Sequence, residues 1–273
     1  MVKIYDLNGS VCGEIKKMPK VFSTKYKPVV ITRAVLALQS QKRQPYGASP
    51  MGGKHTSAHY HGSRHYRFTM MNKELSRIPR IHGRGAGWMA FRARFAPHAV
   101  KGRRAHPPKA EKIYAKKLNR KEHLFAIKSA IAVTSDIKML KDRGHKIDLY
   151  IEKIKEFPVV VIDDFENMNR TKEVTGVIEK LGLSPEIDRC KTKRIRAGRG
   201  KTRGRKYSSK KGLLIVTSKE CSALKSCRNI AGVDVVPMNK LNVELLAPGA
   251  QAGRLTIFTR SAFENLDNLE LER

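Results

Sequence analysis

The side chains best suited to chemistry are cations that alternate with glycines over residues 194–207. A guanidinium can fork onto two oxygens of one phosphate or stack on a nucleobase, and glycine lets the backbone follow a curved phosphate path. The pattern predicts contact with a nucleic acid, with a solvated, disordered charge run as the alternative. The candidate contact residues in this segment are Lys193, Arg194, Arg196, Arg199, Lys201, Arg203, Arg205 and Lys206.

The triplet Gly200-Lys201-Thr202 invites comparison with a nucleotide-binding P-loop. That motif needs another glycine five residues before Gly200, where this chain has Ile195. It also needs a preceding apolar strand, whereas residues 190–193 are Cys-Lys-Thr-Lys. The spacing argues against a P-loop, and we expect no cofactor.

A second cationic segment, residues 45–109, carries 13 Lys and Arg but a single acid, Glu74. Its aromatic residues are Tyr46, Tyr60, Tyr66, Phe68, Trp88, Phe91 and Phe95. Rings interleaved with cations suit RNA, because unpaired bases stack on the rings while phosphates meet the charge. Some rings could instead pack against the protein's own core. The candidate contact residues are Lys54, His55, Arg64, Arg67, Arg77, Arg80, Arg84, Trp88, Arg92, Arg94, Lys101, Arg103, Arg104 and Lys109.

Four histidines of this segment are candidate metal ligands. His55, His59, His61 and His65 are spaced closely enough to suggest a metal, but neither a cysteine nor a carboxylate lies nearby in the sequence to complete a first shell. Histidines in such loops also serve as stacking contacts to RNA. We therefore predict no metal site.

Asp163 and Asp164 follow an apolar run, a position where α/β enzymes often place acids. A Ser/His/Asp grouping and a Gly-rich cofactor turn are both missing from the sequence around them, so a helix cap or a surface salt bridge is favoured and no enzyme is predicted. Two alternatives stay open. One is a nuclease or nucleotide-dependent RNA enzyme that uses these acids with the histidines. The other is a DNA-compacting architectural protein.

Charge sets the class of partner. The chain has 273 residues with 56 Lys and Arg against 24 Asp and Glu, a net charge of +32. Residues 189–211 carry 12 Lys and Arg and no acid, so this segment and residues 45–109 together account for +24. Such a charge implies a dense anionic partner, with nucleic acid first and an anionic membrane second. This net charge excludes an ordinary globular enzyme as the default interpretation.

Membrane insertion and export are not expected. The longest apolar runs, such as residues 159–162, are far shorter than the roughly 18 residues that cross a bilayer. The N-terminus lacks the layout of a secretory signal, so we expect a cytoplasmic protein. Cys12, Cys190, Cys221 and Cys227 match no zinc site or redox pair in their spacing, which predicts reduced thiols.

Apolar patterning outlines the elements that carry these segments. Residues 2–15 predict a hairpin around Asn8-Gly9 with a tight type I′ turn. Helical spacing predicts one helix from Pro28 to before Pro45 and one from Asn119 to Gly144. Continuous apolar runs predict buried strands at 159–162, 213–216, 233–236 and 255–258, with helices around 172–181 and 219–227. Strands that alternate with helices predict an α/β fold with a mostly parallel sheet flanked by helices.

The domain organisation follows from composition. Residues 45–109 hold eight of the 20 Gly and six of the 12 Pro, which disfavours regular structure and a core. We therefore expect a globular domain formed by residues 1–44 and 110–273, with residues 45–109 as a long extended loop lacking its own core. Residues 189–211 are expected to be an Arg/Gly-rich RNA-binding segment within the globular domain.

Three motifs are similar to those of a known family. They are Pro-Arg-Ile-His-Gly at 79–83, Phe-Ala-Pro-His-Ala-Val-Lys-Gly-Arg-Arg-Ala-His-Pro-Pro-Lys-Ala-Glu-Lys at 95–112, and Arg-Ala-Gly-Arg-Gly-Lys-Thr-Arg-Gly-Arg-Lys-Tyr at 196–207. With them the chain resembles the large-subunit ribosomal protein L-four family in its archaeal form, over essentially its whole length.

The resemblance implies a function. It implies a structural constituent of the large ribosomal subunit that binds large-subunit rRNA and stabilises its folding and assembly. It also implies that the loop tip, around residues 78–95, helps line the polypeptide exit tunnel beside the protein L-twenty-two and meets the nascent polypeptide. The Arg-Gly segment would then bind rRNA close to the globular domain, on cytoplasmic ribosomes.

Overall fold

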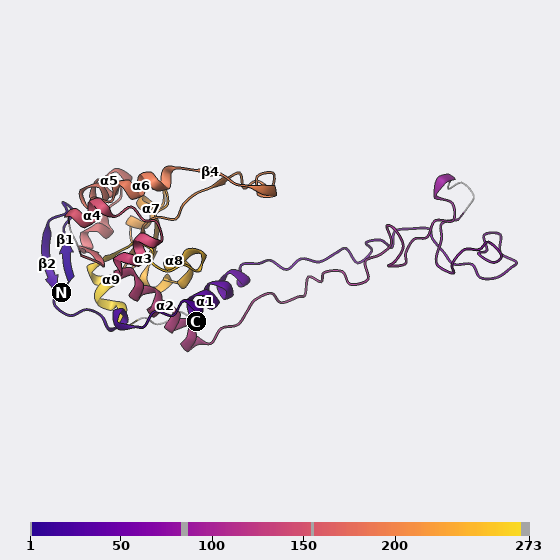
Figure 1. Ribbon diagram of the computed structural model, residues 1–273, viewed down its shortest axis with the longest axis horizontal. Coiled ribbons are helices and arrows are strands. Elements are labelled where there is room, and N and C mark those ends of the chain that lie inside the picture. Colours follow the sequence, from indigo (N-terminus) through magenta and orange to yellow (C-terminus); the bar gives the residue numbers. More distant parts are fainter. Residues whose placement is uncertain (1, 83–86, 154–155, 269–273) are drawn as a thin grey trace. The chain divides into compact units, whose positions relative to one another are not determined.

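The computed structural model describes residues 2–82, 87–153 and 156–268 (Figure 1). The chain divides into two compact units. One, which we call the body, is formed by Met1–Ser40 and Lys116–Arg273, and the other, the loop unit, by Gln41–Ala115.

The body is built on a six-stranded sheet in the order β2-β1-β3-β8-β6-β7. Its strands are β1 (Val2–Tyr5), β2 (Val11–Ile15), β3 (Val159–Val161), β6 (Leu214–Thr217), β7 (Asp234–Pro237) and β8 (Thr256–Thr259). All neighbours pair in parallel except β2, which adds an antiparallel edge to β1. In the centre, Val160 aligns with both Ile4 and Phe258. The apolar runs thus form the strands that the sequence predicts, and the mostly parallel α/β sheet is confirmed.

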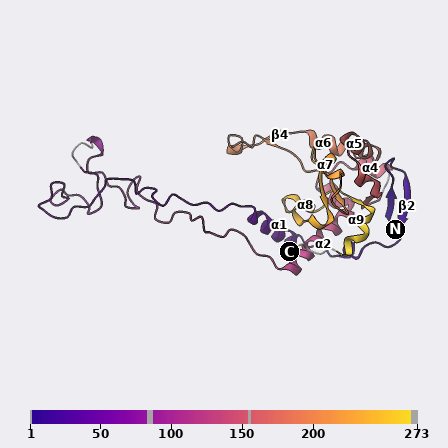
Figure 2. The same cartoon turned by 180° about the vertical axis from the view of Figure 1, so that it is seen from behind.

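Helices cover both faces of this sheet. Successive strand residues point to opposite faces, so Val160 and Phe258 join one apolar cluster while Val159 and Ile257 join the other. The helices are α1 (Pro28–Gln41), α2 (Arg120–Ala132), α3 (Ile137–Asp142), α4 (Asp148–Lys153), α5 (Thr171–Lys180), α6 (Ser184–Lys191), α7 (Ala223–Cys227), α8 (Val243–Leu246) and α9 (Arg260–Glu264). In Figures 1 and 2, α1, α2, α8 and α9 lie on one side of the body and α4, α5 and α6 on the other. Among the described helices, none is long and apolar enough to cross a bilayer.

The predicted tight turn of the first hairpin was wrong. The Asp6 N–H donates to the Ser10 carbonyl at 2.8 Å, and the Gly9 N–H donates to the Asp6 carbonyl at 2.9 Å. A type I′ turn needs positive φ at both central residues, whereas only Gly9 has one here, at 80°. Because Asp6 and Ser10 close the ladder, three residues remain in the loop, as in a type I turn followed by a left-handed residue.

The predicted single helix from Asn119 to Gly144 was also wrong, because α2 and α3 are separate. The hydroxyls of Thr134 and Ser135 donate to carbonyls three residues earlier, at 2.7 and 2.8 Å. The Asp136 carboxylate accepts the backbone N–H two residues on, at 3.0 Å, and so caps α3. Side chains that bond to the local backbone compete with the helical ladder, and here they interrupt it.

The loop unit has little regular structure. Its described part contains the bridges His59–Arg80 and Arg80–Ala93 and one short 3-10 turn, Gly87–Met89. Met70 is the one buried apolar residue among the described residues of this unit. The outgoing and returning segments run side by side, with the Ala48 N–H donating to the Pro108 carbonyl at 3.0 Å (Figure 1). The predicted long loop without its own core is confirmed.

Candidate nucleic-acid interface

The Arg/Gly-rich segment forms a hairpin arm, residues 192–210, between α6 and β6. Its strands β4 (Arg194–Ile195) and β5 (Tyr207–Ser208) pair antiparallel. Every residue of the arm is exposed except Gly200, which is half-buried. The Lys and Arg side chains of the arm contact no carboxylate in the part of the chain that the structure describes. The arm therefore presents a row of uncompensated cations to solvent.

Arg189 ties the two ends of the arm together. On α6, just before the arm, its Nη2 donates to the carbonyl of Lys211, just after the arm, at 3.0 Å. The same guanidinium holds both carboxylate oxygens of Glu186, at 2.6 and 2.8 Å. Glu186 is only 1% exposed, so this pair is a buried, bidentate one. The arm thus leaves and re-enters the body at one fixed place.

Glu186 is supported from behind by His145. His145 Nδ1 lies 2.7 Å from the carboxylate, and the Leu255 N–H donates to Nε2 at 3.3 Å. Because Nε2 accepts, the proton of the neutral ring sits on Nδ1 and is donated to Glu186. Burial lowers the pKa of His145 and keeps the ring neutral. Burial alone would raise the pKa of Glu186, but hydrogen bonds from His145 and Arg189 outweigh it and lower that pKa to about 2.

A second ionic group fixes the start of β6. Asp234 accepts from Lys211 Nζ at 2.9 Å and from Arg254 Nη2 at 2.6 Å. The Arg254 side chain is fully buried and also donates to the carbonyls of Gly212 and Leu213, at 2.8 and 3.1 Å. Burial alone would raise the pKa of Asp234, but Lys211 and Arg254 outweigh it and lower that pKa. Removing Asp234 would leave the buried Arg254 charge without its carboxylate, so this end of the arm is also firmly held.

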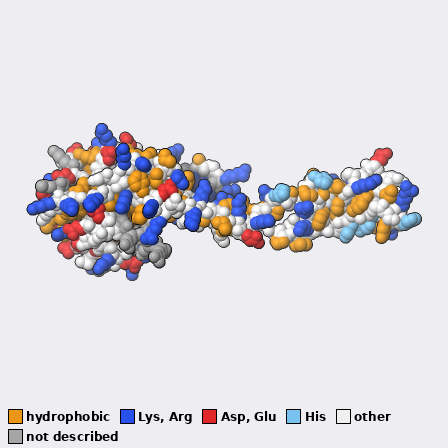
Figure 3. Space-filling model, turned by 90° about the horizontal axis from the view of Figure 1, so that it is seen from below, with side chains coloured by type: hydrophobic (Ala, Val, Ile, Leu, Met, Phe, Trp, Pro, Cys, Tyr) orange, Lys and Arg blue, Asp and Glu red, His pale blue; other side chains and the backbone are white. Residues whose placement is uncertain are grey.

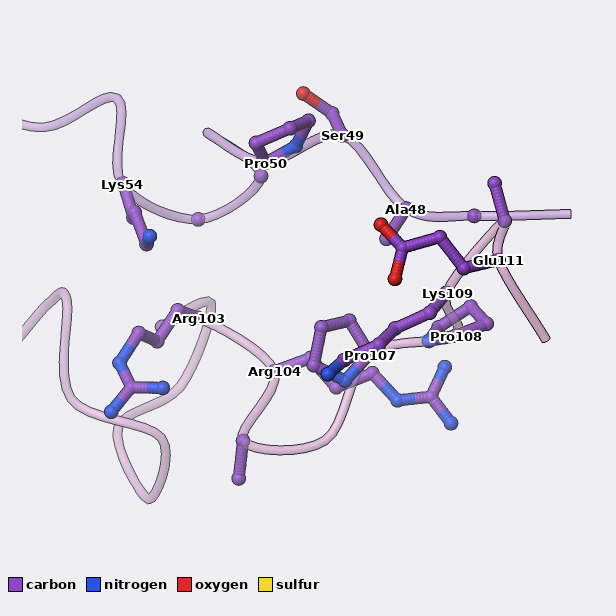
Figure 4. A pocket seen from close by; sticks show the side chains of 16 residues that line it. Ala48, Ser49, Pro50, Lys54, Arg103, Arg104, Pro107, Pro108, Lys109 and Glu111 are labelled. Atoms are coloured by element: carbon purple, nitrogen blue, oxygen red, sulfur yellow. The ribbon is translucent and has the colours of Figure 1, made fainter.

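The two segments of the loop unit enclose a cationic cavity of about 660 Å³ (Figure 4). The residues that line it come from 47–54 and 102–111. Its basic side chains are Lys54, Arg103, Arg104 and Lys109, against one acid, Glu111, among the lining residues. Low-dielectric walls lined by one sign of charge concentrate counter-ions, so the cavity suits an anionic group.

Gly53 lets the two segments approach each other, and Gly102 allows a tight local turn within the returning segment. Gly53 has a φ of +75°, and a Cβ there would lie 2.6 Å from the Cα of Arg103. A Cβ at Gly102 would lie 1.9 Å from the carbonyl oxygen of Ala96. Neither position has room for a side chain, so both glycines are needed for the observed path.

Arg80 holds the distal part of the loop unit. It is buried, at 8% exposed, although the sequence analysis included it among the contact residues. Its Nη1 donates to the Phe91 carbonyl at 2.9 Å, and its Nη2 donates to the hydroxyl and carbonyl of Ser76 at 2.8 and 3.2 Å. These donors all bind acceptors within the loop unit. Arg80 therefore stabilises this part of the unit through hydrogen bonds, where an apolar core would do so in an ordinary domain.

The four closely spaced histidines do not form one cluster. His59 and His61 lie instead beside His82, with 3.0 Å between Nε2 of His61 and Nε2 of His82. Phe68 stacks on His82 at 4.9 Å between ring centroids. Within the described residues, no three His, Cys, Asp or Glu side chains are arranged to hold a metal ion.

Most predicted contact residues are exposed. On the loop unit these are Lys54, His55, Arg64, Arg67, Arg77, Trp88, Arg92, Lys101, Arg104 and Lys109. On the arm they are Lys193, Arg194, Arg196, Arg199, Lys201, Arg203, Arg205 and Lys206. Arg94 and Arg103 are half-buried, and Arg84 lies outside the described residues. Figure 3 shows Lys, Arg and His side chains spread over the visible face of the loop unit, with few acids between them.

Several of these cations lie against aromatic rings. Arg92 Cζ is 4.5 Å from the centre of the Trp88 ring, and Lys73 Nζ is 4.2 Å from that of Phe91. Trp88 is 70% exposed, so one ring and one guanidinium are presented together. Such pairs can stack on bases and meet phosphates at the same place.

Some residues that form or support the candidate interface are not among the predicted contact residues. Tyr114 and Lys112 belong to the returning segment of the loop unit but lie beyond residue 109, where the cationic segment was taken to end. The run of lysines around Tyr114 was the one signal available. Arg189 belongs to the predicted segment 189–211, but its bond to Lys211 and the contact of Glu186 with His145 join residues 22 and 41 positions apart, which spacing in the sequence does not reveal.

The two acids after β3 have a structural role. Asp163 accepts the Ser261 N–H at 2.9 Å and the Ser261 hydroxyl at 2.6 Å, which caps the start of α9. Asp164 is exposed. The cap interpretation of Asp163 therefore agrees with the geometry. The four cysteines are free thiols, also as expected.

Comparison with known proteins identifies the family. Residues 15–269 match the model of the Ribosomal protein L4/L1 family. The chain belongs to this family. It is 40% identical to the large ribosomal subunit protein uL4 of Methanosphaera stadtmanae over 269 residues, 98% of this chain and 96% of the relative. It is 44% identical to that of Haloquadratum walsbyi over 96% and 97% of the two chains, and 43% identical to that of Archaeoglobus fulgidus over 97% of each.

Family membership confirms the resemblance drawn from the three motifs. The L4/L1 protein described here is a structural, non-enzymatic component of the ribosome, of the archaeal type. The nuclease alternative is thereby excluded. The predicted location on cytoplasmic ribosomes is confirmed as well.

Proposed function

We propose that this chain binds large-subunit rRNA through its arm and its loop unit, and that it stabilises the folding and assembly of that RNA. Its relatives are named as proteins of the large ribosomal subunit. The binding acts by charge neutralisation and stacking. Exposed guanidinium and ammonium groups meet phosphates, and exposed rings meet unpaired bases.

One observation carries this proposal: the loop unit is strongly cationic and has no core. Residues 45–109 contain 13 Lys and Arg against one acid, and Met70 is the one buried apolar residue in the described part of the unit. Ordering a backbone costs about 1–2 kcal/mol per residue, whereas burying one Met returns about 1.5–3 kcal/mol. An external partner must supply the difference. A polyanion with stackable bases matches both the cations and the rings.

Within the subunit, we expect the loop tip around residues 78–95 to help line the polypeptide exit tunnel. The support is the family resemblance together with the exposed Trp88 and Arg92 at this part of the loop unit. On this proposal the nascent polypeptide and the protein L-twenty-two are neighbours of the tip.

The test is the salt dependence of binding to large-subunit rRNA. Each phosphate contact contributes a log–log slope of about −0.7 to −0.9, so about 6–10 contacts reduce affinity about 10³- to 10⁵-fold between about 50 and 200 mM salt. Replacing Arg199, Lys201 and Arg203 together by Gln should make the slope shallower by about 2 to 3. The melting temperature of the protein should not change, because these side chains are exposed and unpaired within the described chain.

A matched control removes the same charge from the body. Lys16, Lys17 and Lys20 are exposed, and their triple Gln variant should bind with the wild-type slope. An equal reduction of the salt slope in both variants, or a shallow slope for the wild type, would contradict the proposal. Duplex DNA should compete poorly, whereas effective competition by DNA would favour the architectural alternative.

A further inference from the structure

Two tyrosines face each other across the loop unit at a position to which no function has been assigned. Tyr46 lies on the outgoing segment and Tyr114 on the returning one. Their ring planes are only 4° apart, and their centroids are separated by 6.4 Å. Tyr46 is 56% exposed and Tyr114 is half-buried. Two rings from opposite segments therefore share one orientation while remaining open to solvent.

The pairing of the two segments holds these rings in place. The Ala48 N–H donates to the Pro108 carbonyl at 3.0 Å, two residues after Tyr46. At Gly47 a Cβ would lie 2.9 Å from the Ala110 nitrogen, so the backbones are in close contact there. The tyrosine spacing is thus set by the backbone and not by direct contact between the rings alone.

The two rings leave stacking surface for a third planar group. Stacked carbon atoms meet at about 3.5–4.0 Å, so parallel rings with centroids 6.4 Å apart do not cover each other fully. A planar group that stacks on either ring is parallel to both. The Arg43 guanidinium already lies over the Tyr114 ring, with its Cζ 4.0 Å from the centroid. Planar cations and bases both use such surfaces.

Cations surround the two rings. Both tyrosines line a cavity of about 700 Å³ together with Arg104, Lys109 and Lys112, against one acid, Glu111. Lys112 Nζ lies 5.4 Å from the Tyr114 centroid. A cavity of this volume is within the range that holds a small organic ligand, and its charge favours an anion.

We propose that Tyr46 and Tyr114 form a stacking site for one unpaired RNA nucleotide. The base lies against the parallel rings, and its flanking phosphates meet Arg43, Arg104 and Lys112. The inference rests on the proposed rRNA binding and deepens it, because it assigns one unstacked nucleotide to a defined site in the loop unit.

The chemistry of the cavity selects this occupant. Every nucleotide combines a flat face with a phosphate, whereas a duplex keeps its base faces inside its own stack. Stacking on a ring tolerates any base because every base has a flat π-face, so the site recognises an unstacked base, with purines favoured by their larger stacking area.

The test uses the full chain and a short single-stranded RNA that carries 2-aminopurine at its centre. Stacking on the tyrosines should quench the 2-aminopurine fluorescence. Tyr46→Ala and Tyr114→Ala should each weaken binding about 5- to 150-fold and restore much of the fluorescence. Tyr46→Phe should bind within about twofold of the wild type, because it keeps the ring. An RNA with an abasic site at the same position should bind the wild type as weakly as the intact RNA binds Tyr46→Ala.

Controls separate this site from general RNA binding. Tyr26→Ala, at an exposed tyrosine of the body, should leave affinity and quenching unchanged. Binding could be steeply salt-dependent while intact and abasic RNA bind with equal affinity and the tyrosine variants have no effect. That result would overturn the stacking site but keep the proposed function. Absence of salt-dependent binding to large-subunit rRNA would reject the proposed function itself. Polyglutamate that competes as well as RNA, in a tyrosine-dependent way, would show an acidic peptide to be the ligand and overturn the proposal.

Discussion

At the residue scale, the arginines divide by what their guanidinium groups contact. Arg199 and Arg203 on the arm are exposed and donate to no protein group in the described chain. Arg80, Arg189 and Arg254 instead donate to carbonyls or carboxylates inside the protein. The sequence predicts the exposed set from its glycine spacing. It could not separate Arg80 from that set, because the acceptors of Arg80 are defined only by the folded path of the loop unit.

Acid sensitivity of the body is a prediction at this scale. Burial lowers the pKa of His145, so the ring takes up a proton on unfolding once the pH is below its ordinary value of 6.5. Glu186 has a pKa of about 2 when folded and 4.5 when unfolded. In both cases the unfolded state binds more protons than the folded state. The stabilisation is therefore fully present at neutral pH, and the free energy of unfolding falls as the pH drops. The expected loss is about 1.4 kcal/mol per pH unit for each proton, starting below about pH 6.5 for His145 and below about pH 4.5 for Glu186.

Urea unfolding of the wild type and of His145→Gln between about pH 7 and pH 5 measures this effect. Gln retains a donor and an acceptor, so the variant should lose less stability over this range. Some slope should remain, because burial also lowers the pKa of His123. Parallel loss of stability in the two proteins would mean that His145 does not titrate on unfolding.

At the element scale, the sheet could be predicted and the turns could not. Continuous apolar runs such as residues 159–161 have few alternatives to a buried parallel strand. The loop around Gly9 and the break at Asp136 depend on individual hydrogen bonds, which apolar periodicity does not contain. The same holds for β4 and β5, which pair although both strands are fully exposed.

The pairing of the two loop-unit segments gives a prediction at this scale. Gly53→Ala places a Cβ within 2.6 Å of the Arg103 Cα at a φ of +75°, so the segments must separate. A left-handed residue costs about 1–2 kcal/mol, which predicts at least about a 5- to 30-fold loss of affinity for large-subunit rRNA. The melting temperature of the body should stay constant. Gly62→Ala is the matched control, because its close neighbours are atoms of the flexible Tyr60 side chain. Equal affinity of both variants would mean that RNA binding does not need the paired segments.

At the scale of the whole molecule, stability is divided unequally between the two units. The body contains both apolar clusters, whereas the described part of the loop unit buries one apolar side chain, Met70. Regions with few buried contacts open at low free-energy cost, so they are cut first by proteases. The division could be predicted from the excess of glycine, proline and cations in residues 45–109. The path of the loop unit could not, because it depends on polar contacts such as those of Arg80.

Limited proteolysis of the isolated protein should therefore cut residues 41–115 and the exposed arm first and leave the rest of the body intact. In assembled large subunits the same sites should be cut at least about tenfold more slowly, because RNA contacts raise the cost of opening. Mass spectrometry of the fragments over time measures both rates. Equal resistance in the two states would show that the loop unit is stable without RNA.

The joining of the arm's two ends by Arg189 has a consequence for how the arm can change in length. Residues that enter or leave between positions 192 and 210 do not alter the bond from Arg189 to the Lys211 carbonyl. The entropy of closing such a segment grows only logarithmically, by about 0.6 kcal/mol for each doubling. Insertions and deletions at the tip can therefore adjust how far the arm extends while the neighbouring strands keep their register.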